Sequence, residues 1–139
     1  MTIREFQKGD EVGLLEILKE TWYITEIQEN VLSEWMTNNY NFVAVEEQEI
    51  IGTITLHLQR KLIRNGGLAG FIEDVAVKEK FRGNKIGFLL VQKALEKARD
   101  LGCYKVILSC FDERVNFYEK SGFFRECNTM RVNLQANPI

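Results

Sequence analysis

The sequence has few of the features that mark membrane, secreted and nucleic-acid-binding proteins. Its 18 Lys and Arg residues against 20 Asp and Glu give a formal net charge of −2, so the chain has no broad basic face of the kind that binds nucleic acid. No apolar run approaches membrane-spanning length, and the first ten residues lack the apolar core of a signal peptide. We therefore expect a cytoplasmic protein that binds neither nucleic acid nor membranes.

Cysteine and histidine are also scarce. Cys103, Cys110 and Cys127 have neither metal-ligand spacing nor an even count, which favours reduced thiols. His57 is the only histidine and lies on a predicted strand, with Thr53 and Thr55 on the same face. A surface position on a sheet is expected for it, and no metal site is predicted.

What is present is typical of a soluble globular protein. Apolar residues make up 45% of the 139 residues and charged residues 27%. This length suffices for one domain with a buried core, so a single domain over residues 1–139 is expected.

Alternating and helical apolar patterns predict an α/β fold with a mixed sheet flanked by helices. One helix is expected to begin after Asp10 as its N-cap, because Val12, Leu15, Ile17 and Leu18 mostly share a face. Two further helices are expected to end at Gly102 and at Gly122. The expected strands cover residues 2–6, 41–46, 50–59, 70–77, 104–110 and 123–134, and the expected helices cover about 11–18, 28–36, 85–100 and 112–120.

The most informative stretch runs from Ile72 to Gly87. A strand that contains Glu73 and Asp74 is followed by a basic, glycine-bearing loop and then by an amphipathic helix. This order aims backbone N–H groups at one point, where the helix dipole also favours an anion such as a diphosphate. Strand alternation predicts that the Glu73 and Asp74 side chains point to opposite faces.

These residues resemble the GNAT superfamily of acetyl-CoA-dependent N-acetyltransferases. Residues 82–87 meet the superfamily pattern Arg/Gln-x-x-Gly-x-Gly/Ala with one departure, at Lys85. The runs 102–108 and 116–123 follow at the superfamily's spacing. With residues 72–75 upstream, the chain most resembles the glucosamine-6-phosphate N-acetyltransferases, closely over about residues 60–123. The resemblance implies a mixed sheet that splays at the coenzyme cleft, and a homodimer paired through C-terminal strands.

The resemblance also implies how the co-substrate acetyl-CoA is bound. Backbone N–H groups from the loop hold its pyrophosphate, and its pantetheine arm pairs with the strand edge. Lys85 stands where the family usually has glycine, and we expect a negative φ there. The residues implied in coenzyme binding are Val75, Ala76, Val77, Arg82, Gly83, Asn84, Lys85, Ile86, Gly87, Phe88, Arg114 and Tyr118.

The catalytic residues implied by the resemblance are few. The backbone N–H of Val75 polarises the thioester carbonyl, and Tyr118 gives a proton to the departing thiolate. Glu73 or Asp74, directly or through water, takes a proton from the acceptor amine. The two carboxylates also count as substrate-binding residues.

The acceptor site departs from the family. Ser109 replaces an acidic residue of the glucosamine-phosphate enzymes, and Arg114 and Asn133 replace an asparagine and an arginine. Lys61 and Arg64 match the segment that binds sugar phosphate, and cations suit a dianion. We therefore predict acetyl transfer to a small-molecule primary amine, first of all an amino-sugar phosphate. The alternatives are another small amine, a peptide N-terminus, or an acetyl-CoA-binding module without catalysis.

Overall fold

A computed structural model of the protein describes residues 1–136. Its backbone falls into two compact units, Met1–Leu108 and the segment that starts at Ser109. No helix among the described residues is long and apolar enough to cross a membrane, and no three of their His, Cys, Asp or Glu side chains are grouped to hold a metal ion. The single domain over residues 1–139 stays a prediction.

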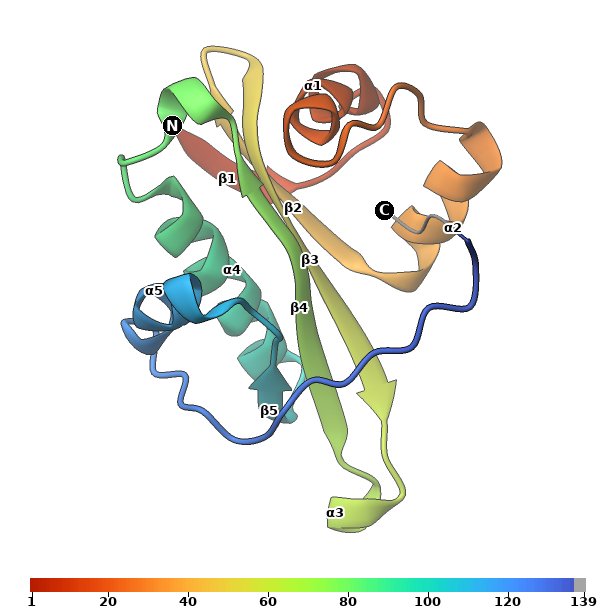
Figure 1. Ribbon diagram of the computed structural model, residues 1–139, viewed down its shortest axis with the longest axis vertical. Coiled ribbons are helices and arrows are strands. Elements are labelled where there is room, and N and C mark those ends of the chain that lie inside the picture. Colours follow the sequence, from red (N-terminus) through yellow and green to blue (C-terminus); the bar gives the residue numbers. More distant parts are fainter. Residues whose placement is uncertain (137–139) are drawn as a thin grey trace. The chain divides into compact units, whose positions relative to one another are not determined.

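The first unit is built on one five-stranded sheet with the order β1-β2-β3-β4-β5. The first four strands are antiparallel neighbours, and β5 runs parallel to β4. This confirms the predicted mixed α/β sheet (Figure 1). The strands are β1 Thr2–Glu5, β2 Tyr40–Glu46, β3 Glu49–Arg60, β4 Leu68–Val77 and β5 Cys103–Ile107.

Helices cover both faces of this sheet (Figure 1). On one face, α1 (Glu11–Trp22) and α2 (Glu29–Asn38) bury an apolar cluster that includes Ala76 of β4. On the other, α4 (Ile86–Asp100) lies so close to β3 that a Cβ atom on Gly52 would be 2.9 Å from Leu90. We call these the α1/α2 face and the α4 face. The first unit also contains two short helical turns, α3 Ile63–Gly66 and η1 Glu79–Phe81.

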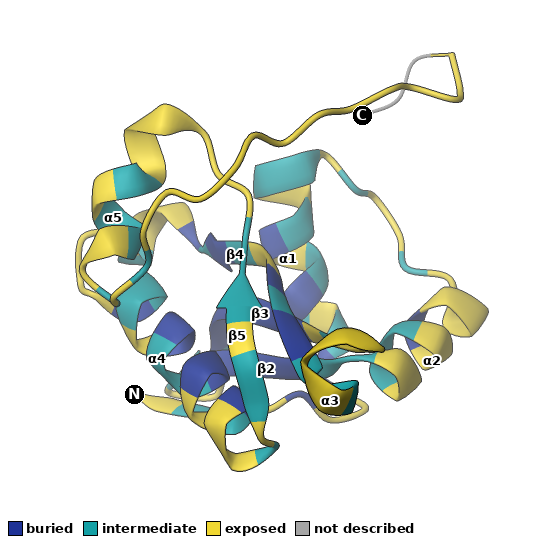
Figure 2. Cartoon of the chain, turned by 90° about the horizontal axis from the view of Figure 1, so that it is seen from below, coloured by how far each residue is buried: buried dark blue, intermediate teal, exposed yellow. Residues whose placement is uncertain are grey.

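The sequence patterns predicted the central elements well. The apolar residues that recur at helical spacing in α4 are all buried, namely Ile86, Leu90, Val91, Ala94, Leu95 and Ala98. Burial is also continuous along β3 from Ile50 to Leu56 (Figure 2). The hairpin turn at Glu47 and Gln48 has positive φ at both residues, 46° and 70°, which suits the right-handed twist of the strands it joins. Each buried aliphatic side chain contributes about 1.5–3 kcal/mol relative to an exposed one.

Two local predictions for α1 hold only in part. Asp10 occupies the N-cap position, but its side chain makes no cap bond; instead it accepts hydrogen bonds from Arg4, at 2.7 and 3.0 Å, and from the Gln7 N–H. Val12 is exposed, while Leu14 and Ile17 are buried. The strand β1 supplies a charged partner for Asp10, and this ion pair replaces the expected cap.

The second unit contains η2 (Asp112–Arg114) and α5 (Val115–Glu119), which confirms a short helix in this region. Leu108–Cys110 lie beyond the end of β5, which is shorter than predicted. The predicted last strand over residues 123–134 is absent, although Met130, Val132 and Leu134 alternate with polar residues and are exposed. A strand exists only when its backbone pairs with another, and these residues have no ladder partner within the described part of the chain.

Candidate active site

The loop between β4 and α4 ends in residues with positive φ, and this backbone conformation exposes the N–H groups at the start of α4. Gly83 has φ 87°, and Lys85, the N-cap of α4, has φ 64°. The first bond of the helix runs from the Leu89 N–H to the Lys85 carbonyl, at 3.0 Å. The N–H groups of residues 85–88 therefore have no partner within the helix and lie at its positive end. The expectation of a negative φ at Lys85 is wrong, because the chain needs a left-handed residue to enter α4.

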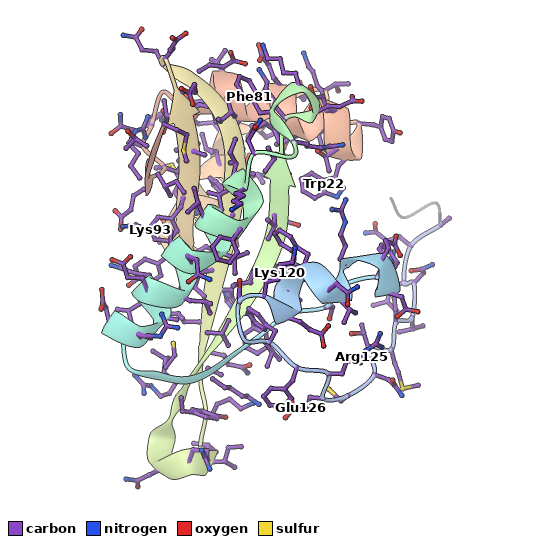
Figure 3. The ribbon with its side chains drawn as sticks, turned by 90° about the vertical axis from the view of Figure 1, so that its left-hand side faces the viewer. Trp22, Phe81, Lys93, Lys120, Arg125 and Glu126 are labelled. Carbon is purple, nitrogen blue, oxygen red and sulfur yellow. The ribbon has the colours of Figure 1, made fainter. Side chains whose placement is uncertain are left out.

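Side chains of the loop fix its shape without filling it. The Arg82 Nε donates to the Val77 carbonyl at 3.0 Å, and the Asn84 side chain donates to the Phe81 carbonyl at 3.1 Å. Figure 3 marks Phe81 in the turn before α4. A Cβ atom on Gly83 would meet nothing within 4 Å. The loop is thus held open, exposed and rich in free donors, which fits the diphosphate of a coenzyme.

A buried lysine anchors the start of this loop. Lys78 is 6% exposed, and its ammonium bonds to Glu16 of α1 and, at 2.7 Å, to Glu49 of β3. Burial opposes the charge, but the two carboxylates outweigh it and raise the pKa of Lys78. Its backbone N–H also donates to the Ile51 carbonyl at 2.8 Å. This role could not be predicted from the sequence, because a single lysine after a strand is typical of an ordinary solvated strand end.

The second half of β4 has an open edge. Its pairing with β5 ends at Phe71 and Ile107, so none of the residues from Ile72 to Val77 pairs with β5. This is the splay that the family resemblance implies between the two parallel strands. Val75, Ala76 and Val77 all lie on this edge, where an extended amide-containing arm can bind in the manner of an added strand.

A β-bulge lies in the same half of β4. Thr53 pairs with Ala76 and Thr55 with Glu73, so that Ile54 lies opposite two residues, Asp74 and Val75. Neither of these two has a partner in the strand register. Asp74 takes a left-handed φ of 53°, as the first residue of some bulges does. The extra residue leaves the Val75 backbone outside the regular ladder.

The strand register gives the face on which one of the two carboxylates lies. Thr53 and Thr55 share one face of β3, so their partners Ala76 and Glu73 share it too. Because Ala76 packs with the α1/α2 cluster, Glu73 lies on the α1/α2 face. Glu73 and Asp74 are both exposed. Even so, surrounding protein withdraws enough water from Asp74 that desolvation raises its pKa above 3.8.

In the second unit, aromatic packing surrounds Tyr118. Its ring makes edge-on contacts with Phe117 and Phe123, with centroids 4.9 and 5.9 Å away. Burial raises the pKa of Tyr118; Cys110 adds to the rise, and Arg114 opposes it. The phenol therefore stays protonated at neutral pH, as a proton donor must be. Arg114 is exposed at the end of η2.

Ser109 has a hydroxyl partner of its own. Its Oγ lies 2.7 Å from the Thr129 Oγ1. Two hydroxyl groups joined in this way carry no charge, so neither can act as the acidic residue that the family resemblance implies at this position. Asn133 accepts a hydrogen bond from the Arg131 Nε at 2.7 Å.

Lys61 and Arg64 lie at the tip of the hairpin between β3 and β4. The Lys61 N–H donates to the Gly67 carbonyl at 2.8 Å, and the Arg64 guanidinium lies 5.1 Å from the centre of the Tyr104 ring. About six strand residues separate this tip from Asp74, which corresponds to about 20 Å. One chain therefore does not bring these cations to its own bulge.

Sequence reasoning missed a polar network at the end of α2. The Trp35 carbonyl accepts hydrogen bonds from the Asn39 and Asn41 side chains, at 3.1 and 3.2 Å. Asn41 is buried and accepts a bond from the Thr55 hydroxyl at 2.8 Å. Asn39 reaches His57 at 3.1 Å. The asparagine-rich run at residues 38–41 is the only signal in the sequence, and such a run also fits an ordinary helix end.

Comparisons with known proteins agree with this geometry. The model of the acetyltransferase (GNAT) family matches residues 12–123. Glucosamine 6-phosphate N-acetyltransferase 1 of Dictyostelium discoideum is 30% identical over 142 residues, which cover 99% of this chain and 90% of that protein. The Schizosaccharomyces pombe glucosamine 6-phosphate N-acetyltransferase is 43% identical over 91 residues, which cover 63% of this chain and 82% of that protein.

Solved structures show the same fold over nearly the whole chain. The glucosamine-6-phosphate N-acetyltransferase of Arabidopsis thaliana superimposes with a TM-score of 0.89 at 30% identity, covering 96% of this chain and 98% of its own. An acetyltransferase of Trypanosoma brucei gives a TM-score of 0.90, also at 30% identity, covering 96% of this chain and 99% of its own. Together with the open edge of β4 and the free N–H groups before α4, these matches confirm the resemblance seen in the sequence: the chain belongs to the GNAT family of acetyltransferases.

Proposed function

We propose that the protein transfers the acetyl group of acetyl-CoA to the amino group of glucosamine 6-phosphate. The observation that carries the coenzyme half is the free N–H row at residues 85–88, next to a β4 edge without a partner strand. The acceptor half is supported by relatives of that name, one of which matches 99% of this chain. We also propose that residues 1–139 act as one domain, and the span of the family model over residues 12–123 supports this.

The chain's own residues bind the coenzyme by charge and by backbone pairing. The loop N–H groups and the exposed Arg82 suit the pyrophosphate, and the β4 edge suits the amides of pantetheine. Acetyl-CoA supplies the activated acetyl group as a thioester. The proposed coenzyme contacts are Val75, Ala76, Val77, Arg82, Gly83, Asn84, Lys85, Ile86, Gly87, Phe88, Arg114 and Tyr118.

Three groups manage charge and protons during the transfer. The Val75 N–H, free of a register partner, donates to the carbonyl oxygen as negative charge develops there. The amine nitrogen forms the new bond to the carbonyl carbon, and the bond from that carbon to sulfur breaks. Tyr118 gives its proton to the sulfur. The amine loses a proton to a carboxylate, Glu73 or Asp74, and desolvation raises the pKa of Asp74, which strengthens that carboxylate as a base.

The phosphate of the acceptor needs cations, and Lys61 and Arg64 supply them. Because about 20 Å of strand separates them from the bulge in one chain, the protein acts as a homodimer in which these cations serve the other copy. The alternating, exposed Met130, Val132 and Leu134 support pairing between C-terminal segments. Light scattering that gives the mass of a monomer at assay concentration would remove this part of the proposal.

The reaction is tested by measuring CoA release with glucosamine 6-phosphate and with a panel of other amines, which includes polyamines, amino acids and peptides. We expect the sugar phosphate to be turned over best, in an enzyme that works on small molecules in the cytoplasm. Turnover of a polyamine or a peptide without turnover of the sugar phosphate contradicts the proposed acceptor. Tight binding of CoA in calorimetry without any turnover would instead indicate a binding module, as the uncharged Ser109 allows.

A further inference from the structure

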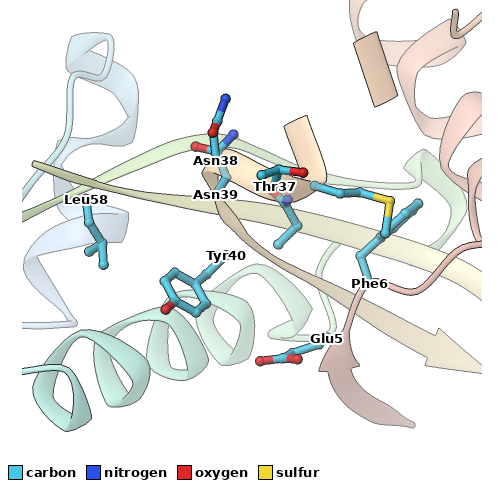
Figure 4. Close-up of a pocket in the computed structure, with 9 residues that line it drawn as sticks. Glu5, Phe6, Thr37, Asn38, Asn39, Tyr40 and Leu58 are labelled. Atoms are coloured by element: carbon cyan, nitrogen blue, oxygen red, sulfur yellow. The ribbon is translucent and has the colours of Figure 1, made fainter. Parts of the chain in front are cut away.

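The Trp35 carbonyl organises two asparagine side chains at the junction of α2 and β2. Asn39, which lies beside Tyr40 in this junction (Figure 4), donates its amide N–H to that carbonyl at 3.1 Å, and Asn41 does so at 3.2 Å. A carbonyl oxygen only accepts hydrogen bonds, so each amide must turn its nitrogen toward Trp35 and its oxygen away. The orientation of both amides is thereby fixed by chemistry.

This orientation selects the tautomer of His57. The His57 Nδ1 lies 3.1 Å from the Asn39 Oδ1. Because that oxygen only accepts, Nδ1 must carry the hydrogen, and the Nε2 of the neutral ring is a bare acceptor. The ring of Phe71 lies 6.2 Å away on the neighbouring strand. The imidazole is therefore held by a hydrogen bond and an aromatic neighbour while it remains exposed.

The strand register places this acceptor near Glu73. His57 pairs with Phe71 and Thr55 pairs with Glu73, so His57 and Glu73 are diagonal neighbours on the α1/α2 face. The coenzyme loop opens at the start of α4, which covers the opposite face. An amine that approaches the bulge from the face without α4 passes over Glu73 and His57. Both groups offer hydrogen-bond acceptors to it.

The distance along the strand excludes His57 as the general base. His57 is three residues from Ile54, which lies opposite the bulge, and this corresponds to about 10 Å. A general base must lie within hydrogen-bond reach of the amine, so His57 is too far to deprotonate an amine at Val75. Its side chain projects from the strand and can instead reach the outer hydroxyl groups of an amino sugar whose amine lies at Val75, where O–H donors are available.

We propose that His57 is a specificity-determining residue whose Nε2 accepts a hydrogen bond from a ring hydroxyl of the amino sugar. Asn39 and the Trp35 carbonyl act through it as positioning groups. The inference rests on the proposed function, and it adds a contact that favours hydroxyl-bearing amines over plain amines. An amine without hydroxyl groups gains nothing from His57.

Two substitutions test the roles of the two ring nitrogens of His57 one at a time. In His57→Asn, the amide N–H replaces the Nδ1 donor to Asn39, and nothing replaces Nε2. In His57→Gln, the amide oxygen reaches the place of Nε2. Gln59→Ala is the matched control, since Gln59 is exposed and lies two residues along the same face of β3.

The experiment measures kcat and KM with glucosamine 6-phosphate and with cyclohexylamine, and the Kd of CoA by calorimetry. We expect His57→Asn to raise the KM for the sugar about threefold to tenfold, the value of one hydrogen bond, with the KM for cyclohexylamine and the Kd of CoA unchanged. His57→Gln should recover part of the loss, and Gln59→Ala should behave as the wild type.

The outcomes separate this role from the function it rests on. If the wild type turns over the sugar phosphate and His57→Asn leaves its KM unchanged, the role of His57 is wrong and the proposed function stands. An equal rise of KM for the sugar and for cyclohexylamine indicates a purely structural histidine and also overturns the inference. A wild type that acetylates no sugar amine defeats the proposed function, and the role of His57 with it.

Discussion

Lys85 offers a test of the coenzyme loop that separates backbone from side chain. It holds a left-handed φ of 64° at the N-cap of α4, and it places a cation at the positive end of a helix. A residue with a Cβ loses about 1–2 kcal/mol in this conformation, and the unfavourable helix dipole adds about 0.3–1 kcal/mol. Glycine removes both costs, but it destabilises the fold by about 0.4–1 kcal/mol because it raises the conformational entropy of the unfolded chain.

We therefore expect Lys85→Gly to stabilise the protein by about 1 kcal/mol, which raises Tm by about 4 °C in a chain of this size. Lys85→Ala keeps the strained φ and removes only the charge, so its gain should be about half as large or less. Urea unfolding at equal ionic strength measures both variants. Since backbone N–H groups bind the pyrophosphate in our proposal, the Kd of CoA should change by less than about threefold in either variant.

Two results would refute this reasoning. If Lys85→Gly is no more stable than Lys85→Ala, the left-handed conformation is not what limits the wild type. If both variants bind CoA more than tenfold more weakly, the side chain of Lys85, and not the backbone, holds the phosphate. Parallel loss in Arg82→Gln would extend that conclusion to the whole loop.

Three further predictions test the proton donor, an ion pair and a helix contact. Tyr118→Phe should lower kcat about hundredfold without changing stability, and an unchanged kcat in stopped-flow assays would exclude it as the donor. The Arg4 guanidinium lowers the pKa of Asp10 below 3.8, so the ion pair stabilises the fold fully above that pH and loses its effect as the pH falls through the lower, folded-state pKa. Arg4→Met should therefore lower the free energy of unfolding by about 2 kcal/mol at pH 7 and by clearly less at pH 2.5, as measured by urea unfolding. Gly13→Ala places a Cβ 2.7 Å from Ile50, and the clash of about 1–3 kcal/mol should outweigh a helix gain of about 1 kcal/mol and lower Tm.

The sequence predicted the parts of the fold that local pattern controls. The inner residues of α4, the two-residue turn at Glu47 and the glycine-bearing loop before α4 each follow from spacing or residue type alone. The mixed sheet followed from the order of these elements and from the family resemblance. Features that depend on a neighbour in space were not predictable in the same way.

Particular residues show why the rest was missed. Asp10 has the sequence of a cap, but Arg4 of β1 takes its carboxylate. Residues 123–134 have the alternation of a strand, yet alternation does not supply a partner strand. Lys78 and Asn41 become structural only because hydrogen-bonding partners from other elements meet their buried side chains. The family roles assigned to Glu73, Val75 and Tyr118 remain predictions that kinetics must test.

The bulge in β4 changes which residues of the strand, odd-numbered or even-numbered, face α1 and α2. Before it, odd-numbered residues such as Phe71 and Glu73 face α1 and α2, and after it an even-numbered residue, Ala76, does so. A deletion of Asp74 would restore regular alternation and turn one half of the strand over relative to the other. Either the apolar residue at 76 or the carboxylate at 73 would then face the wrong side. Insertions and deletions in β4 are thus constrained far more tightly than substitutions, and sequence alignments of relatives should show no gaps there.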